Sequence, residues 1–227
     1  MLDLERSMGI FWIRDASKVL FGDRASPLRA IFHWWMRSNN LQMLHAATVS
    51  TREGGVLIPG KSGSGKSTVA LACLLSGLNY LGDDHILVGD ANLPIAYSLY
   101  NSAKLHYDHL CSFPDLASKV RNKPEHENEK AVIYLYQHYP ELIREKVEIR
   151  KILIPEITDS QESEICDASK AESLRALAPS TLFQLTGSAS GDFQSIVKVV
   201  KDVPGYKLKL GTDLSQIPGV IQRSFLT

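Results

Sequence analysis

The residues best suited to chemistry lie in one short segment of this 227-residue chain, Gly60 to Ser67. Its sequence, GKSGSGKS, fits the pattern GxxxxGK[ST] in full, after an apolar run and before a helical pattern. Glycine permits backbone angles closed to other residues, so successive N–H groups can point at one anion, and the positive end of the next helix adds to this. The segment predicts a phosphate-binding loop, in which Lys66 neutralises the β- and γ-phosphates and the Ser67 hydroxyl binds Mg²⁺. The residues expected to hold the nucleotide are Gly60, Lys61, Ser62, Gly63, Ser64, Gly65, Lys66, Ser67 and Thr68.

Two adjacent carboxylates, Asp83 and Asp84, follow Lys66 after one short helical pattern and an apolar run. Neighbouring residues of a strand point to opposite faces, but at the end of a strand, where the chain turns, both can approach one site. One carboxylate would then hold Mg²⁺, directly or through water, and the other would accept a proton from an incoming hydroxyl. The alternative is an ordinary surface turn.

A histidine upstream of the loop is placed by hairpin geometry. If residues 51–54 form the tip of a β-hairpin, Val49 faces Val56, and the same register puts His45 opposite Gly60, where the loop opens. His45 could then tune the acidic pair or bind the transferring phosphate. The alternative is a core histidine that is satisfied by a backbone carbonyl.

Two lysines are further candidates for phosphate or lid contacts. Lys104 follows a polar stretch in which Asn101 or Ser102 would cap a helix, and it either reaches a phosphate or lies at the surface. Lys130 directly follows the polar segment 121–129, the expected mobile loop, and would close over the nucleotide as a lid cation.

Two other polar pairs carry weaker signals. His106 and His109 lie three residues apart, but no cluster of cysteine or carboxylate accompanies them, so a zinc site is disfavoured. Ser180 and Thr181 are expected to cap a helix first and to contact a substrate second.

Composition limits the class of protein. Hydrophobic residues make up 44 % of the chain, enough for a sizeable core, and 25 basic side chains balance 25 acidic ones. That balance gives no general attraction to nucleic acid or to an acidic membrane. Three widely spaced cysteines and the absence of an apolar run of ~20 residues indicate a reduced, cytoplasmic protein without a membrane span. We expect one domain, 1–227, in which residues 1–40 form an N-terminal extension packed on the core.

The hydrophobic pattern predicts the elements that must position these residues. A helix should begin at Ser26-Pro27 and end at Asn39-Asn40, and residues 41–50 and 55–59 should form a hairpin. Residues 67–76 should form a helix and 78–88 one buried strand that the acidic pair interrupts. The remaining expected strands are 130–136, 148–157 and 206–210, and the remaining expected helices are 180–185, 193–203 and 218–226.

The segment from His45 to Val88 resembles the catalytic core of the HPr kinase/phosphorylase family. The likeness lies in LHAATV, GKSGSGKST and LGDD, which occur in the same order and with the same compact layout. The resemblance implies an α/β fold of the P-loop, phosphoenolpyruvate carboxykinase-like type, with a mixed β-sheet flanked by helices. It also implies that His45 and Asp83 act on the hydroxyl proton and that Ser67 and Asp84 handle magnesium.

The function expected on these grounds is transfer of a phosphoryl group from ATP, or another nucleoside triphosphate, to a hydroxyl with the help of Mg²⁺. The expected acceptor is a serine of a protein or peptide, and neither nucleic acid nor a membrane is an expected partner. Two alternatives stay open: a nucleotide-dependent switch that hydrolyses ATP without an acceptor, and a kinase of small-molecule hydroxyls. The sequence also leaves a homo-oligomer open.

Overall fold

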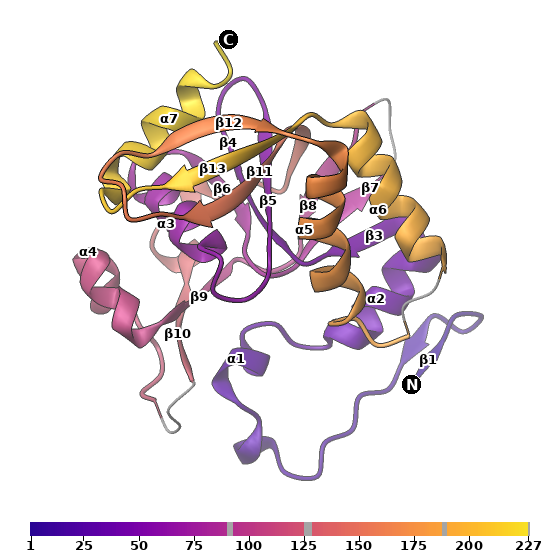
Figure 1. Cartoon of the computed structure of the whole chain (residues 1–227). Coiled ribbons are helices and arrows are strands. Elements are labelled where there is room, and N and C mark those ends of the chain that lie inside the picture. Colours follow the sequence, from indigo (N-terminus) through magenta and orange to yellow (C-terminus); the bar gives the residue numbers. More distant parts are fainter. Residues whose placement is uncertain (90–92, 125–128, 188–189, 227) are drawn as a thin grey trace.

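The computed structural model describes residues 1–89, 93–124, 129–187 and 190–226 (Figure 1). Its α-helices are α1 Phe21–Arg24, α2 Arg29–Ser38, α3 Lys66–Leu75, α4 Pro114–Ala117, α5 Lys170–Leu182, α6 Ser190–Asp202 and α7 Ile217–Arg223. Its strands are β1 Leu2–Asp3, β2 Met8–Gly9, β3 Leu41–Leu44, β4 Ala46–Ser50, β5 Gly55–Pro59, β6 Asn79–Gly82, β7 Ile86–Gly89, β8 Ile95–Ser98, β9 Ser102–His106, β10 Lys130–Tyr134, β11 Lys146–Ile157, β12 Glu164–Ala168 and β13 Gly205–Leu210.

A mixed sheet forms the centre of the fold. Its strands lie in the order β3-β7-β8-β11-β5-β4-β6, and β13 and β12 extend it beside β11. β11 pairs in parallel with β5 and β13, whereas the other pairs of this sheet are antiparallel. The expected mixed sheet flanked by helices is confirmed.

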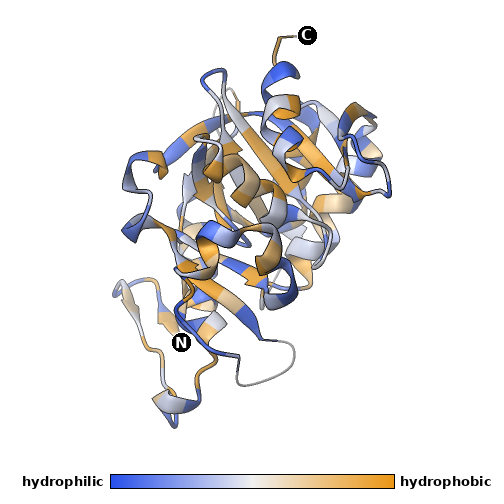
Figure 2. Cartoon of the chain, turned by 90° about the vertical axis from the view of Figure 1, so that its left-hand side faces the viewer, coloured by the Kyte–Doolittle hydropathy of each residue, from blue (hydrophilic) through white to orange (hydrophobic). Residues whose placement is uncertain are grey.

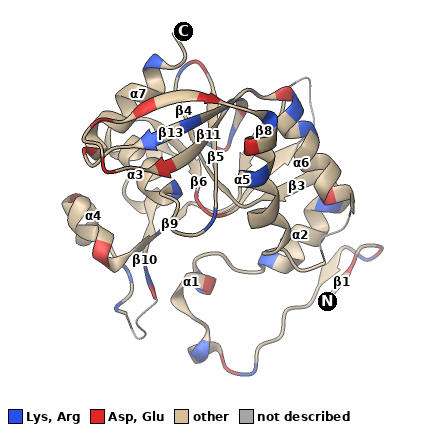
Figure 3. Ribbon diagram, in the orientation of Figure 1, with Lys and Arg blue, Asp and Glu red and all other residues tan. Residues whose placement is uncertain are grey.

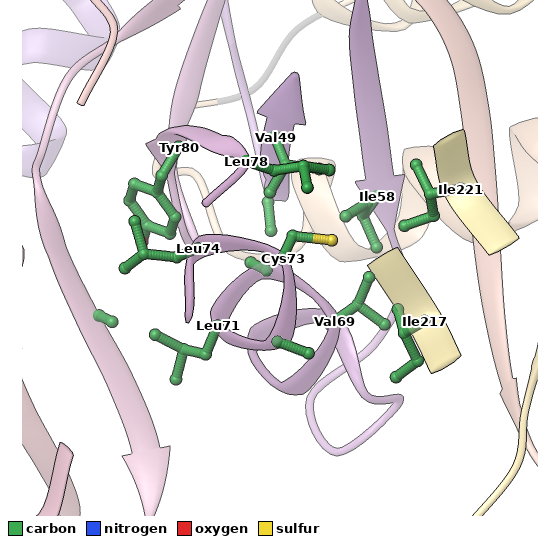
Figure 4. Close-up of a cluster of buried hydrophobic side chains, with 14 of the residues drawn as sticks. Val49, Ile58, Val69, Leu71, Cys73, Leu74, Leu78, Tyr80, Ile217 and Ile221 are labelled. Atoms are coloured by element: carbon green, nitrogen blue, oxygen red, sulfur yellow. The ribbon is translucent and has the colours of Figure 1, made fainter. Parts of the chain in front are cut away.

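Helices cover both faces of this sheet. Successive side chains of a strand point to opposite faces, and in this sheet both faces are apolar and must be buried. Ala47 and Val49 of β4 pack into one buried cluster with α3 and α7, whereas Leu57 of β5 packs into a second cluster with α5 and α6. Figure 4 shows the first cluster, in which Leu71 and Cys73 of α3 lie among the side chains from the sheet and α7. α3 is buried along most of its length, so the loop that precedes it is held on a rigid element.

The hairpin expected before the loop is confirmed with its register. Val49 pairs with Val56, and Ala46 pairs with Pro59, the last residue of β5. The turn is closed by the Thr51 N–H, which donates to the Gly54 carbonyl over 3.0 Å. The chain passes directly from the carboxyl end of β5 into the glycine-rich loop 60–65.

Two segments expected as single strands are each divided in two. Residues 41–50 form β3 and β4, which separate at His45 and pair with different neighbours. The expected strand 78–88 likewise becomes β6, beside β4, and β7, between β3 and β8. The physical reason is the left-handed backbone of Asp84, at φ 65°, which turns the chain out of the first strand.

The expected helix start at Ser26-Pro27 is wrong. α2 begins at Arg29 because Leu28 adopts a left-handed conformation, at φ 57°, that a helix cannot continue. The Ser26 hydroxyl instead accepts a hydrogen bond from Lys104 over 2.6 Å. The helix expected after Asn101 is wrong as well, since residues 102–106 pair with β10 as a strand.

Further differences lie near the C-terminus. Ser180 and Thr181 do not begin a helix: they lie inside α5, which continues through Pro179 and is capped at Ser169 by a reciprocal capping box with Glu172. β12 is not among the expected strands, and it pairs with β13. Part of the loop expected at 121–129, residues 125–128, lies outside the described residues. Among the helices described, none combines the length and the hydropathy that a bilayer-spanning segment requires.

The first 28 residues, which we call the arm, run outside the main body before α2 (Figure 1). β1 and β2 pair with each other at its start, and β1 contacts α2. Figure 2 shows hydrophobic segments along this arm. Its largest exposed apolar side chains are Met1, Leu4, Met8, Ile10, Phe11, Trp12, Ile13, Leu20 and Leu28.

Candidate active site

The glycine-rich loop predicted to bind phosphate lies between the carboxyl end of β5 and the first turn of α3. Gly60, Gly63 and Gly65 adopt φ values of 146°, 78° and 98°, which residues other than glycine rarely adopt. Gly65 immediately precedes α3, so the free N–H groups of the first turn of α3 lie beside the loop. The backbone therefore has the two features that a phosphate site needs, a glycine-rich bend and a helix N-terminus.

Lys66, the first residue of α3, is buried within this bend. Its Nζ donates to the Lys61 carbonyl over 3.1 Å, so the side chain folds back across the loop. Burial lowers the pKa of the Lys66 ammonium, and the charges of Asp83 and Asp84 offset part of this effect. The ammonium is thus a poorly hydrated cation within reach of any phosphate that the loop holds.

Asp83 follows β6 and is almost fully buried, at 4 % exposure. Its Oδ1 accepts from the Asp84 N–H over 2.9 Å, whereas its buried Oδ2 has no hydrogen-bond partner among the described residues. Burial raises the pKa of Asp83, and the charge of Asp84 raises it further, against smaller opposing effects of Ser67 and Lys66. A buried carboxylate oxygen without a partner is a candidate ligand for a cation.

Asp84 lies between an imidazole and an ammonium group. Its Oδ1 lies 3.6 Å from His45 Nε2 and its Oδ2 lies 3.7 Å from Lys104 Nζ. Burial opposes ionisation of this carboxyl, but His45, Lys104 and Lys130 outweigh burial and hold the pKa of Asp84 well below its usual range. His45 was expected to assist Asp83, but the structure places its ring at Asp84.

His45 reaches this position because β3 and β4 separate there. Continuing the β4–β5 register beyond Ala46 and Pro59 puts His45 opposite Gly60, as expected. Its backbone N–H donates to Thr181 Oγ1 over 3.1 Å, and its Nδ1 lies 3.4 Å from Gln184 Nε2. Residues from the region of α5 thus orient the imidazole toward Asp84.

Sequence reasoning missed His85. Both of its ring nitrogens are buried without a hydrogen-bond partner among the described residues, and its ring centre lies 5.7 Å from that of His45. Burial lowers the pKa of His85 to about 3, although Asp84 acts in the opposite direction. The signal that could have found this residue is its position directly after the acidic pair.

The remaining candidates meet around one small cavity of about 60 Å³. Residues of the loop, Asp84, Lys104 and Lys130 line it together with His106 and His109. Lys104 lies on β9 and Lys130 on the paired β10, so the β9–β10 ribbon brings both lysines to the loop.

Burial lowers the pKa of Lys104, and the charges of Asp84 and Asp83 offset part of this effect. His106 and His109 belong to the lining of the same cavity, and no group of three metal-binding side chains is found among the described residues.

The site fits a magnesium ion. Mg²⁺ is usually bound by one or two protein oxygens, with waters and substrate phosphates completing an octahedron. The Ser67 hydroxyl and the Asp83 carboxylate are oxygen ligands, and Asp83 Oδ2 has no other partner among the residues described. These two residues would hold the ion beside the loop.

The buried His85 makes stability sensitive to acid. Its pKa is about 3 in the folded protein, below its value in the unfolded chain, so the unfolded chain binds the proton first. The contribution of His85 to the free energy of unfolding is therefore complete above pH ~6.5. About 2 kcal/mol of this free energy is lost by pH 5. Urea denaturation at pH 7 and pH 5, in buffer with a chelator, should show this loss in the native protein and a smaller loss in His85→Gln. The exposed His138→Gln serves as the control, and an equal loss in His85→Gln and the native protein would contradict the prediction.

Comparisons with known proteins give a similarity of fold. No protein-family profile matches the chain, and no curated protein matches it. The structure is similar to that of the Hpr(Ser) kinase/phosphatase from Coxiella burnetii, with a TM-score of 0.48 and 13 % sequence identity over 82 % of this chain and 91 % of that chain. At this level the similarity carries no functional weight, so the function has to come from the residues of the site.

Proposed function

We propose that this protein transfers the γ-phosphoryl group of ATP, or of another nucleoside triphosphate, to the hydroxyl of a serine in a protein or peptide. The observation that carries the proposal is the convergence of Lys66, both aspartates and His45 on the glycine bend at the end of β5. Such a set supplies the parts of phosphoryl transfer: a cradle for phosphates, a cation, a metal ligand and a proton acceptor.

The cationic part of the site would stabilise the charge of the transferring group. In the reaction the acceptor oxygen forms a bond to the γ-phosphorus, the bond from that phosphorus to the leaving diphosphate oxygen breaks, and the hydroxyl proton passes to a carboxylate. Lys66, which is poorly hydrated, and the N–H groups at the start of α3 face the phosphates. Fixed charges in a desolvated site act more strongly than the same charges in water.

The two aspartates are proposed to divide the remaining work. Asp83, buried beside Ser67 with Oδ2 unpartnered among the described residues, suits the magnesium ion, which neutralises phosphate charge when bound. Asp84 lines the cavity and is aligned by His45 and Lys104, which suits contact with the acceptor hydroxyl. The family resemblance implies the opposite roles. We favour Asp83 as the metal ligand and Asp84 as the proton acceptor because Asp83 has almost no exposed surface from which to meet an acceptor.

The surroundings of His45 favour a peptide as acceptor. Gln184, whose amide lies 3.4 Å from the His45 ring, lines two open cavities, of about 620 Å³ and about 750 Å³. Cavities of that size, open to solvent, accommodate a chain segment, whereas a metabolite kinase needs a closed pocket that keeps water out.

The proposal is tested with the full chain, Mg²⁺ and ATP labelled on the γ-phosphate. We expect label to pass to serine peptides and to a much smaller extent to threonine-free, serine-free peptides of otherwise similar composition. Free phosphate released at one rate with and without peptide would instead indicate a switch ATPase. Label found on sugars or polyols, and not on peptides, would indicate a small-molecule kinase. Calorimetry without heat on addition of Mg-ATP would overturn all three.

A further inference from the structure

A cavity of about 750 Å³ lies between the arm and the body, and we call it the arm cavity. Phe11 and Ile13 of the arm line one side, and Ala30 and Ile31 of α2 line another, with Leu185 of the segment after α5. Its volume is within the range of ligand-binding sites, and its wall is largely apolar.

Two residues that line the arm cavity contact residues of the candidate active site. One is Gln184, next to the His45 ring. The other is Ser26, whose hydroxyl accepts from Lys104 Nζ over 2.6 Å, and Lys104 in turn lies 3.7 Å from Asp84. A molecule in the cavity is therefore one side chain away from His45 on one side and two from Asp84 on the other.

The end of the arm is fastened to the strand that carries Lys104. The Tyr100 hydroxyl donates to the Pro27 carbonyl over 2.6 Å, and the Ser102 hydroxyl donates to the Ala25 carbonyl over 2.9 Å. Together with the Lys104–Ser26 contact, these bonds tie three successive arm residues to alternate residues 100, 102 and 104. The base of the cavity is thus set by the same ribbon that places Lys104 at the active site.

The charges that line the cavity are mainly positive. Three cations, Lys18, Arg24 and Arg29, face one carboxylate, Asp23, which lies 3.7 Å from Arg29. Arg24 donates to the carbonyls of Val19 and Ser17. These carbonyls are neutral, so the two hydrogen bonds do not cancel the positive charge of Arg24. Figure 3 shows both basic and acidic residues along the arm. A complementary ligand carries apolar side chains and carboxylates.

We propose that the arm cavity docks the acceptor of the phosphoryl group as a peptide segment with apolar and acidic residues beside the reactive serine. This inference rests on the function proposed above and adds to it the chemical class of the acceptor and the place where it binds. Apolar side chains of the peptide pack against Phe11, Ile13 and α2, its carboxylates lie near Lys18 and Arg24, and its serine extends past Gln184 toward His45 and Asp84.

Binding of defined peptides to the full chain tests the proposal. Three fluorescein-labelled octapeptides, each with one serine, are measured by anisotropy without nucleotide: one with Leu, Phe, Asp and Glu, one with Lys in place of the acids, and one with Gly in place of the apolar residues. We expect the acidic–apolar peptide to bind at least about 10-fold more tightly than either of the others, a difference of about 1.4 kcal/mol.

Arm variants provide the matched controls. Phe11 and Ile13, exposed by 59 % and 39 %, line the cavity, whereas Trp12 between them is 77 % exposed and does not line it. The double variant Phe11→Ser, Ile13→Ser should weaken binding of the acidic–apolar peptide by about 10-fold, because it removes apolar contact area. Trp12→Ser should change it by less than about 2-fold. Lys18→Glu should shift preference toward the basic peptide. Thermal unfolding checks that each variant is folded.

The outcomes separate this inference from the proposed function. Equal binding of the three peptides, or equal losses in Trp12→Ser and in the double variant, would overturn the docking site even if the protein phosphorylates serine. Selective peptide binding that depends on Phe11 and Ile13, in a protein that gives no heat with Mg-ATP, would support the docking site and overturn the kinase.

Discussion

Lys66→Met is expected to reduce phosphoryl transfer by about 10³-fold, because loss of one preorganised charge-stabilising group in a desolvated site reduces the rate by about 10²- to 10³-fold and this variant also weakens nucleotide binding. Lys66 is buried at the start of α3 and reaches across the loop to the Lys61 carbonyl, so its charge lies within the bend. Methionine keeps most of the apolar stem and removes the charge.

The measurement is the initial rate of label transfer from ATP to serine peptides, with Mg-ATP binding followed by calorimetry. Lys146→Met is the matched control, since Lys146 is exposed at the start of β11 and does not line the cavity around the loop. Thermal unfolding should show both variants folded. Transfer at the native rate in a folded Lys66→Met protein would remove this residue from the proposed site.

Asp84→Asn is expected to lower kcat by about 10²- to 10⁴-fold even at saturating magnesium, the usual range for loss of a general base. The carboxylate is aligned by His45 at 3.6 Å and Lys104 at 3.7 Å, and the amide keeps its shape but not its capacity to accept the proton. Asp83→Asn should instead change the dependence of the rate on Mg²⁺. It should raise the Mg²⁺ concentration required for half-maximal rate, and part of the lost rate should return at high Mg²⁺.

Titration of the rate with Mg²⁺ in both variants separates the two roles. Asp167→Asn, at an exposed position of β12, is a control for the loss of one carboxylate. If Asp84→Asn is the variant that high Mg²⁺ restores, and Asp83→Asn is the one that it does not, the roles are those that the family resemblance implies. Equal, full activity in both variants would exclude phosphoryl transfer at this pair.

Several parts of the site follow from the sequence because they depend on local backbone chemistry. The glycines at 60, 63 and 65 are where the chain takes positive φ values, and the pattern of apolar residues around the short turn sets the β4–β5 register. That register is enough to place His45 opposite Gly60, since one slip would expose the buried face of each strand. These features are set by residues that are close together in the sequence.

The pairing of His45 with Asp84 depends instead on contacts between distant segments. β3 and β4 are one apolar run in the sequence. They separate because the first half of the run pairs with β7 and the second half pairs with β5. Thr181 and Gln184, far along the chain, then orient the imidazole. The burial of His85 and the contact between Ser26 and Lys104 arise in the same way.

The sequence by itself therefore determined the glycine-rich loop, the strand before it, the helix after it, and the proximity of a histidine and an acidic pair. Only the tertiary structure decided which carboxylate the histidine meets and where the arm encloses a cavity. Local patterns act through φ, ψ and side-chain period, which each residue carries with it. Contacts between distant segments depend on which strands pair and how the faces pack, and many pairings satisfy the same local pattern.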